Sequence, residues 1–152
     1  MNKLALGMIL LIGGGVAWRA MRSDAPEPKL LFDRFWVDHE PTQRDEKFKV
    51  FFVNGEEPFG RFVDRTTWTG AFELFHYHFL PSRDGELDFL FGRTNERQRI
   101  KYTARRCHEG GFDYCLELTG TTRGVQRYYS KRQWDPERDE SAFVERLAAS
   151  MK

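Results

Sequence analysis

Apolar and polar residues alternate along most of the chain in short segments that turn residues separate. Strict alternation places successive side chains on opposite faces of an extended strand, so each segment predicts a β-strand with one buried face. Turn signals such as Asn54-Gly55 and Gly110-Gly111 lie between the segments. The eight predicted strands are Leu30 to Asp38, Lys47 to Val53, Gly60 to Thr67, Ala71 to Leu80, Glu86 to Gly92, Arg97 to Cys107, Phe112 to Thr119 and Gly124 to Lys131.

The hairpins around the fifth predicted strand can be given a register, because residues that lie opposite one another share a face. A turn of four residues between Gly92 and Arg97 sets Phe89 opposite Ile100, Leu87 opposite Tyr102 and, on the other face, Asp88 opposite Lys101. The preceding turn sets Phe79 opposite Phe89 and Tyr77 opposite Phe91. Phe75, Tyr77 and Phe79 are therefore predicted to point inward.

The pattern changes after residue 134. Asp135-Pro136 is an N-cap followed by a first-turn proline. An apolar helical stripe follows, made of Phe143, Val144, Leu147, Ala148 and Met151. Residues 135–152 are therefore predicted to form a short amphipathic helix after a β-domain over residues 30–134.

The predicted fold is mostly β, with a single core. Eight consecutive antiparallel strands around an aromatic interior close most economically into an up-and-down barrel, because closure leaves no exposed edges. A two-sheet β-sandwich is the alternative.

The chain begins with an apolar segment from Leu4 to Trp18, with Lys3 before it and Arg19 after it. As a helix of fifteen residues it reaches only about 22 Å, short of the roughly 30 Å hydrocarbon core. Residues 1–22 are interpreted as a signal peptide cut after Ala17 or as an uncleaved helix that anchors the domain to the membrane. Residues 23–29 form a linker. Both interpretations place the domain in the cell envelope, outside the cytoplasm.

The composition predicts an aromatic interior, and its balanced charge excludes a general attraction to nucleic acid. Fourteen Phe, five Tyr and four Trp make up 15% of the chain, and 24 basic against 23 acidic residues give a net charge of +1. The two cysteines, Cys107 and Cys115, lie opposite each other across a predicted hairpin. They are expected to form a structural disulfide, because the oxidising environment outside the cytoplasm permits one.

Trp36 in the first predicted strand, Arg127 in the last and the terminal helix form a pattern that resembles the lipocalin or calycin barrels. The resemblance covers Leu30 to Met151. It implies that the Trp closes the barrel floor and that the Arg packs across it. The glycine that the family has two residues before the Trp is Arg34 here, which departs from the pattern.

Arg127 is the most informative single candidate. A two-residue turn at Thr121-Thr122 sets Leu116 opposite Arg127 and Tyr114 opposite Tyr129, which directs Arg127 into an apolar interior. There it either stacks on Trp36 as a structural cation or binds an anionic group inside a ligand cavity. The candidate ligand-binding or barrel-closing residues are Trp36, Tyr77, Phe89, Tyr102, Arg127 and Tyr129.

We recognise no catalytic motif, no cofactor motif and no convincing metal site. His76 and His78 share a strand face, but the register directs them outward and no third ligand has a suitable spacing. The protein is therefore expected not to be an enzyme, and an active site assembled from residues distant in the sequence is kept as a third hypothesis. The first hypothesis is an exported or membrane-tethered barrel that binds a hydrophobic or amphipathic small molecule in its interior. The alternative is an accessory or scaffold protein, a solid barrel that binds a partner protein in the envelope through exposed aromatic side chains such as Phe51 or Tyr128.

Overall fold

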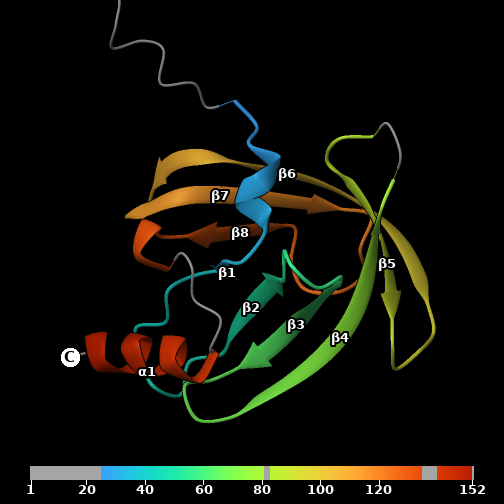
Figure 1. Ribbon diagram of the computed structural model, residues 1–152. Coiled ribbons are helices and arrows are strands. Elements are labelled where there is room, and N and C mark those ends of the chain that lie inside the picture. The colour runs from blue at the N-terminus through green and yellow to red at the C-terminus, as the bar shows by residue number, and fades with distance from the viewer. Residues whose placement is uncertain (1–24, 81–82, 135–139, 152) are drawn as a thin grey trace, which may run out of the picture.

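The computed structural model describes residues 25–80, 83–134 and 140–151 (Figure 1). Its eight strands pair in chain order, and the last strand returns to the first, so the sheet is a closed antiparallel barrel. The strands are β1 (Phe35–Val37), β2 (Phe48–Val53), β3 (Phe59–Arg65), β4 (Gly70–Phe79), β5 (Glu86–Phe91), β6 (Arg97–Glu109), β7 (Phe112–Thr119) and β8 (Arg127–Ser130). The up-and-down barrel is confirmed, in place of the two-sheet sandwich.

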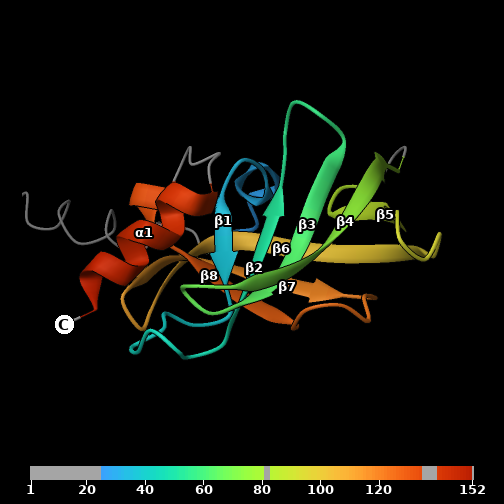
Figure 2. The same cartoon turned by 90° about the horizontal axis from the view of Figure 1, so that it is seen from below.

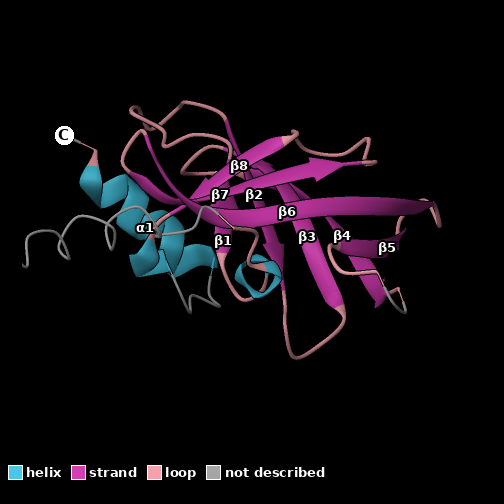
Figure 3. Cartoon of the chain, turned by 90° about the horizontal axis from the view of Figure 1, so that it is seen from above, coloured by secondary structure: helices cyan, strands magenta, loops and turns pink. Residues whose placement is uncertain are grey.

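Helical structure is confined to the two ends of the described chain, where η1 (Pro28–Leu31) precedes β1 and η2 (Arg132–Trp134) and α1 (Glu140–Ser150) follow β8 (Figure 3). The first predicted strand was therefore too long. The chain turns between η1 and β1, where Asp33 adopts a left-handed φ of 56° and its carboxylate accepts the N–H of Gly55 (2.9 Å). No helix within residues 25–80, 83–134 and 140–151 is long and apolar enough to cross a membrane, and the predicted N-terminal segment lies outside them.

The registers around β5 differ from the predicted ones by two residues. Tyr77 lies opposite Phe89, and Ile100 lies opposite Leu87. A shift of two keeps every side chain on its face. Phe75 and Tyr77 are accordingly buried, as predicted, whereas Phe79 is 65% exposed because it stands at the end of β4.

The barrel has two apolar clusters, one inside the sheet and one outside it. Inward side chains such as Trp36, Phe51 and Phe75 form the interior. Outward side chains of β1 and β2, including Phe35, pack instead against Phe143 of α1, with ring centroids 4.6 Å apart. Figure 2 shows α1 beside β1, so the predicted terminal helix covers one outer face of the barrel.

Candidate functional site

Four of the six predicted site residues meet in the barrel interior: Trp36, Tyr77, Phe89 and Tyr102. At one end of the barrel, the indole Nε1 of Trp36 donates to the carbonyl oxygen of Leu31 in η1 (3.1 Å). At the centre of this interior, Phe75 stacks on Phe89 with ring centroids 4.0 Å apart. Phe51, Phe62 and Phe91 also contact this pair, and all five rings are buried. Aromatic rings therefore fill the space where an interior ligand would lie.

Arg127 does not enter this interior, so its predicted role there is wrong. The β7–β8 register differs by one residue from the predicted one, because Arg127 lies opposite Glu117 and Leu116 lies opposite Tyr128. A shift of one moves every side chain to the other face. Arg127 is on the outer surface and pairs with Glu117 (3.1 Å), while Tyr128 is fully buried.

Tyr129 also lies outside, where its ring stacks on that of Phe112 with centroids 5.0 Å apart. The cause of the shift is the loop between β7 and β8. It is longer than the predicted two-residue turn, since Leu118 N–H donates to the carbonyl oxygen of Gln126 (2.8 Å). Gly120 and Gly124 take positive φ values of 89° and 68° within this loop, which favours glycine at both positions.

Among the residues that the structure describes, the buried cation is Arg34, which directly precedes β1. Its side chain is inward, two residues before Trp36, and it is only 2% exposed. The guanidinium carbon lies 4.1 Å from the ring centroid of Tyr114, and Nη1 donates to the carbonyl oxygen of Lys131 (3.2 Å). The residue that departed from the lipocalin pattern therefore supplies the interior cation. The two-residue spacing from Trp36 was the signal that could have found it.

A polar cluster closes the barrel at the end opposite η1, and the sequence reasoning missed it. Arg123, in the β7–β8 loop, pairs with Glu73 (2.7 Å) and Glu96 (3.0 Å), and its guanidinium lies 4.8 Å from the centroid of Phe91. Hydrogen bonds from Gln98 and then from Arg123 hold the pKa of Glu96 below its ordinary value. These ion pairs keep the loop across the barrel end.

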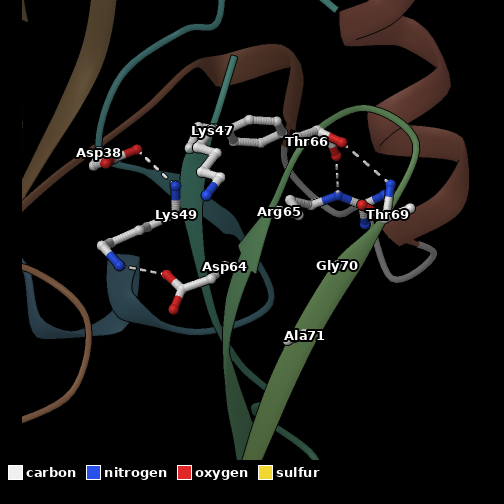
Figure 4. Close-up of a pocket in the computed structure, with 10 residues that line it drawn as sticks. Asp38, Lys47, Lys49, Asp64, Arg65, Thr66, Thr69, Gly70 and Ala71 are labelled. Carbon is white, nitrogen blue, oxygen red and sulfur yellow. Dashed lines mark hydrogen bonds and ion pairs between the residues drawn. The ribbon is translucent and has the colours of Figure 1, made fainter. Parts of the chain in front are cut away.

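At the same end of the barrel lies an open pocket of about 590 Å³, bounded by the start of β2, the end of β3 and the turn that follows it (Figure 4). Most of its charges have partners within the protein. Lys49 pairs with Asp64, Arg65 pairs with Glu140, and Asp38 accepts the backbone N–H of Lys49 (2.8 Å). The pocket consequently offers few unsatisfied charges to a ligand, and neither it nor a second pocket of about 190 Å³ is lined by Tyr77, Phe89 or Tyr102.

Besides Phe79, three large apolar residues of the described chain are exposed: Trp68 in the turn before β4, and Phe72 and Leu74 on the outer face of β4. Trp68 is 65%, Phe72 is 62% and Leu74 is 48% exposed. We call these three residues the β4 apolar face. Phe51 and Tyr128, which the sequence suggested as exposed contacts, are instead fully buried. The alternation of β4 does place Phe72 and Leu74 outward, so this face could have been found from the sequence.

The remaining candidates from the sequence are the two cysteines and the two histidines of β4. Cys107 and Cys115 lie at disulfide-bonding distance, with Cα atoms 5.7 Å apart. His76 and His78 are exposed on the outer face of β4, as the register predicted. Within the described residues, no three His, Cys, Asp or Glu side chains gather as a metal site.

Comparison of the sequence with models of protein families finds no match, and comparisons with curated proteins and with solved structures find none either. The closed eight-stranded barrel agrees with a lipocalin-like architecture. Arg34 and the outward Arg127 depart from the Trp and Arg pairing of that family. The surface and the interior of this barrel therefore carry the functional argument.

Tyr128 gives a pH-dependent prediction. Burial raises the pKa of Tyr128 far above its ordinary value of 10, and its hydroxyl oxygen accepts the N–H of Val125 (3.1 Å). The unfolded chain loses this proton first as the pH rises, so the stabilisation is complete below pH 10 and is lost above it. We expect the free energy of unfolding to fall by about 1.4 kcal/mol per pH unit for this group.

Urea unfolding at about pH 10.5 and about pH 11.5 measures this slope, because the loss begins only above the unfolded pKa of about 10. Tyr128→Phe has no proton to lose, so its slope should be shallower than that of the wild type. Equal slopes for the two proteins would contradict the prediction.

Proposed function

We propose that this chain is a non-enzymatic barrel domain, exported or tethered to a membrane, that binds a partner protein through the β4 apolar face. One observation carries the proposal. A barrel that buries its aromatic interior completely still leaves Trp68, Phe72 and Leu74 in solvent. Apolar groups exposed together on a soluble domain are typical of protein contact sites.

The packed interior supports this scaffold function over an interior ligand. A site for a small molecule needs an enclosed space of several hundred Å³. In this barrel the five contacting Phe rings occupy the centre, and Arg123 with its two glutamates closes one end. An interior ligand would have to displace several buried rings, each of which contributes a few kcal/mol of stability.

The composition of the β4 apolar face also resembles a protein interface. Aromatic side chains are enriched in the cores of such interfaces, and a polar rim surrounds them. Polar residues also border this face: Arg61 on β3 lies opposite Leu74, and His76 follows Leu74 on the same face of β4. The Cys107 and Cys115 pair supports a site outside the cytoplasm, where a disulfide persists.

Photo-crosslinking in cells that produce the protein naturally tests this function. A photoreactive amino acid replaces Phe72, and a control replaces Arg127, which is exposed on β8 across the barrel. We expect a defined protein adduct from position 72 that position 127 does not give. Absence of an adduct from position 72 would contradict the proposed function.

A further inference from the structure

β4 extends beyond the strand that should cover one of its sides. β3 pairs with β4 from Gly70 to His76, but β5 pairs with it only from Phe75 onward. Just beyond β5, Gly92 N–H donates one further hydrogen bond to the carbonyl oxygen of Leu74 (3.2 Å), and the chain then turns away from β4. Figure 1 shows the first half of β4 with no strand along its outer side. We call Gly70–Leu74 the β4 overhang.

The backbone of the β4 overhang has groups that point toward the missing strand. Thr66 N–H donates to Thr69 O (2.9 Å) and Tyr77 N–H donates to Pro58 O (3.0 Å), which fixes the ladder with β3. In that alternation Ala71 and Glu73 bond to β3, whereas Gly70 and Phe72 direct their N–H and C=O groups away from it. Across the described parts of the chain, these groups have no backbone hydrogen-bond partner.

The same barrel has a second overhang, and an extended segment covers it. β6 extends past β5 at the opposite end, since β5 pairs only with its first part, up to Lys101. There Pro26 forms an antiparallel bridge with Arg105, and Glu27 N–H donates to Ala104 O (2.6 Å). An added extended segment is therefore how this fold satisfies such an edge, and the β4 overhang offers the same bonds.

The charges beside the β4 overhang select the chemistry of the added strand. The 190 Å³ pocket at its inner side is lined by three cationic residues, Lys49, Arg93 and Arg123. Lys49 pairs with Asp64, and Arg123 pairs with Glu73 and Glu96. Arg93 has no ion pair with any residue that the structure describes. An acidic side chain would complement it.

We propose that the partner adds an extended strand to Gly70–Leu74, with apolar side chains on Phe72 and Leu74 and an acidic side chain directed at Arg93. This proposal rests on the proposed function, because it specifies how the β4 apolar face binds protein. Strand addition of this kind obtains affinity from backbone hydrogen bonds and specificity from alternate side chains.

The test uses peptides selected with the full-length chain from a phage library of short random sequences. Binding of the selected peptides is then compared between Phe72→Pro and Phe72→Ala. Proline at position 72 removes an N–H that bonds to no neighbouring strand, so it blocks strand addition while leaving the ladder with β3 intact. We expect Phe72→Pro to bind about tenfold or more weakly than Phe72→Ala.

Equal binding by the two variants would overturn strand addition and leave contact through the Phe72 side chain, so the proposed function would stand. Failure to select any peptide, with the crosslink at position 72 retained, would overturn strand addition alone. A dimer of the chain that Phe72→Pro abolishes would overturn the choice of a partner protein as occupant. Absence of the crosslink at position 72 would instead contradict the proposed function itself.

Two further measurements do not depend on the proline variant. In wild-type protein, the Phe72 amide should exchange rapidly with deuterium and become protected when a selected peptide binds, whereas Ala71 and Glu73 stay protected throughout. Selected peptides should carry Asp or Glu, and this preference should disappear with Arg93→Glu. Unchanged exchange at Phe72 or an unchanged acidic preference would overturn the corresponding half of the proposal.

Discussion

Replacing Phe75 by Ala is expected to lower the free energy of unfolding by about 3 to 5 kcal/mol. Phe75 is fully buried at the centre of the barrel, where its ring stacks on that of Phe89 with centroids 4.0 Å apart. The ring centroids of Phe51 and Phe62 lie 6.0 Å and 5.4 Å from that of Phe75. The backbone of Gly60 lies against the same ring. A Cβ at that position would be 2.3 Å from Phe75 Cζ, so close packing surrounds the ring. The neighbours cannot fill a hole of this size by small movements.

Phe72→Ala is the matched control, because it makes the same change three residues away on the same strand. Phe72 is 62% exposed on the outer face, so we expect a change of less than about 0.5 kcal/mol. Urea unfolding of both variants measures the difference. Similar losses from the two variants would contradict the packed interior and, with it, the argument against an interior ligand.

The sequence predicted the barrel and most of its inward residues because alternation does not depend on the exact turn. The hairpin turns on both sides of β5 were misjudged, yet each error shifted the register by two residues, as the observed pair of Tyr77 and Phe89 shows. A register error of two residues leaves every side chain on its predicted face. Phe75, Tyr77 and Phe89 were therefore placed correctly in the interior.

The β7–β8 hairpin shows where this reasoning fails. Its loop contains two glycines with positive φ, Gly120 and Gly124, and its real length changes the register by one residue. That single step exchanges Arg127 and Tyr128 between surface and interior. Turn lengths of this kind depend on backbone conformations that residue types only suggest, so the predicted interior cation was assigned to the wrong strand and Arg34 was missed.

Alternation also cannot tell which outward apolar residues are covered. Phe35 and Phe52 point outward and are buried beneath α1, whereas Phe72 and Leu74 point outward and remain in solvent. The difference lies in where a distant helix docks. The β4 overhang has a similar origin, because it follows from the unequal lengths of paired strands and not from the pattern of any one strand.

Replacing Phe143 by Ala is expected to lower the free energy of unfolding by about 3 kcal/mol and to loosen α1 from the barrel. Phe143 is fully buried, stacked on Phe35 at 4.6 Å and edge-on to Trp134 at 5.0 Å. Glu140 at the start of α1 also pairs with Arg61 (2.9 Å) and with Arg65. These partly exposed ion pairs orient the helix, but the buried ring supplies most of its docking energy.

Glu145→Ala is the matched control on the exposed side of α1, and it should change stability by less than about 0.5 kcal/mol. Urea unfolding gives the stability of both variants, and a dye that fluoresces on apolar surface reports whether the outer faces of β1 and β2 become accessible. We expect dye binding by Phe143→Ala and none above the wild type by Glu145→Ala. A Phe143→Ala protein with wild-type stability and no dye binding would show that α1 is not what covers Phe35 and Phe52. The contrast with the uncovered β4 apolar face would then need another explanation, since something other than α1 would cover Phe35 and Phe52.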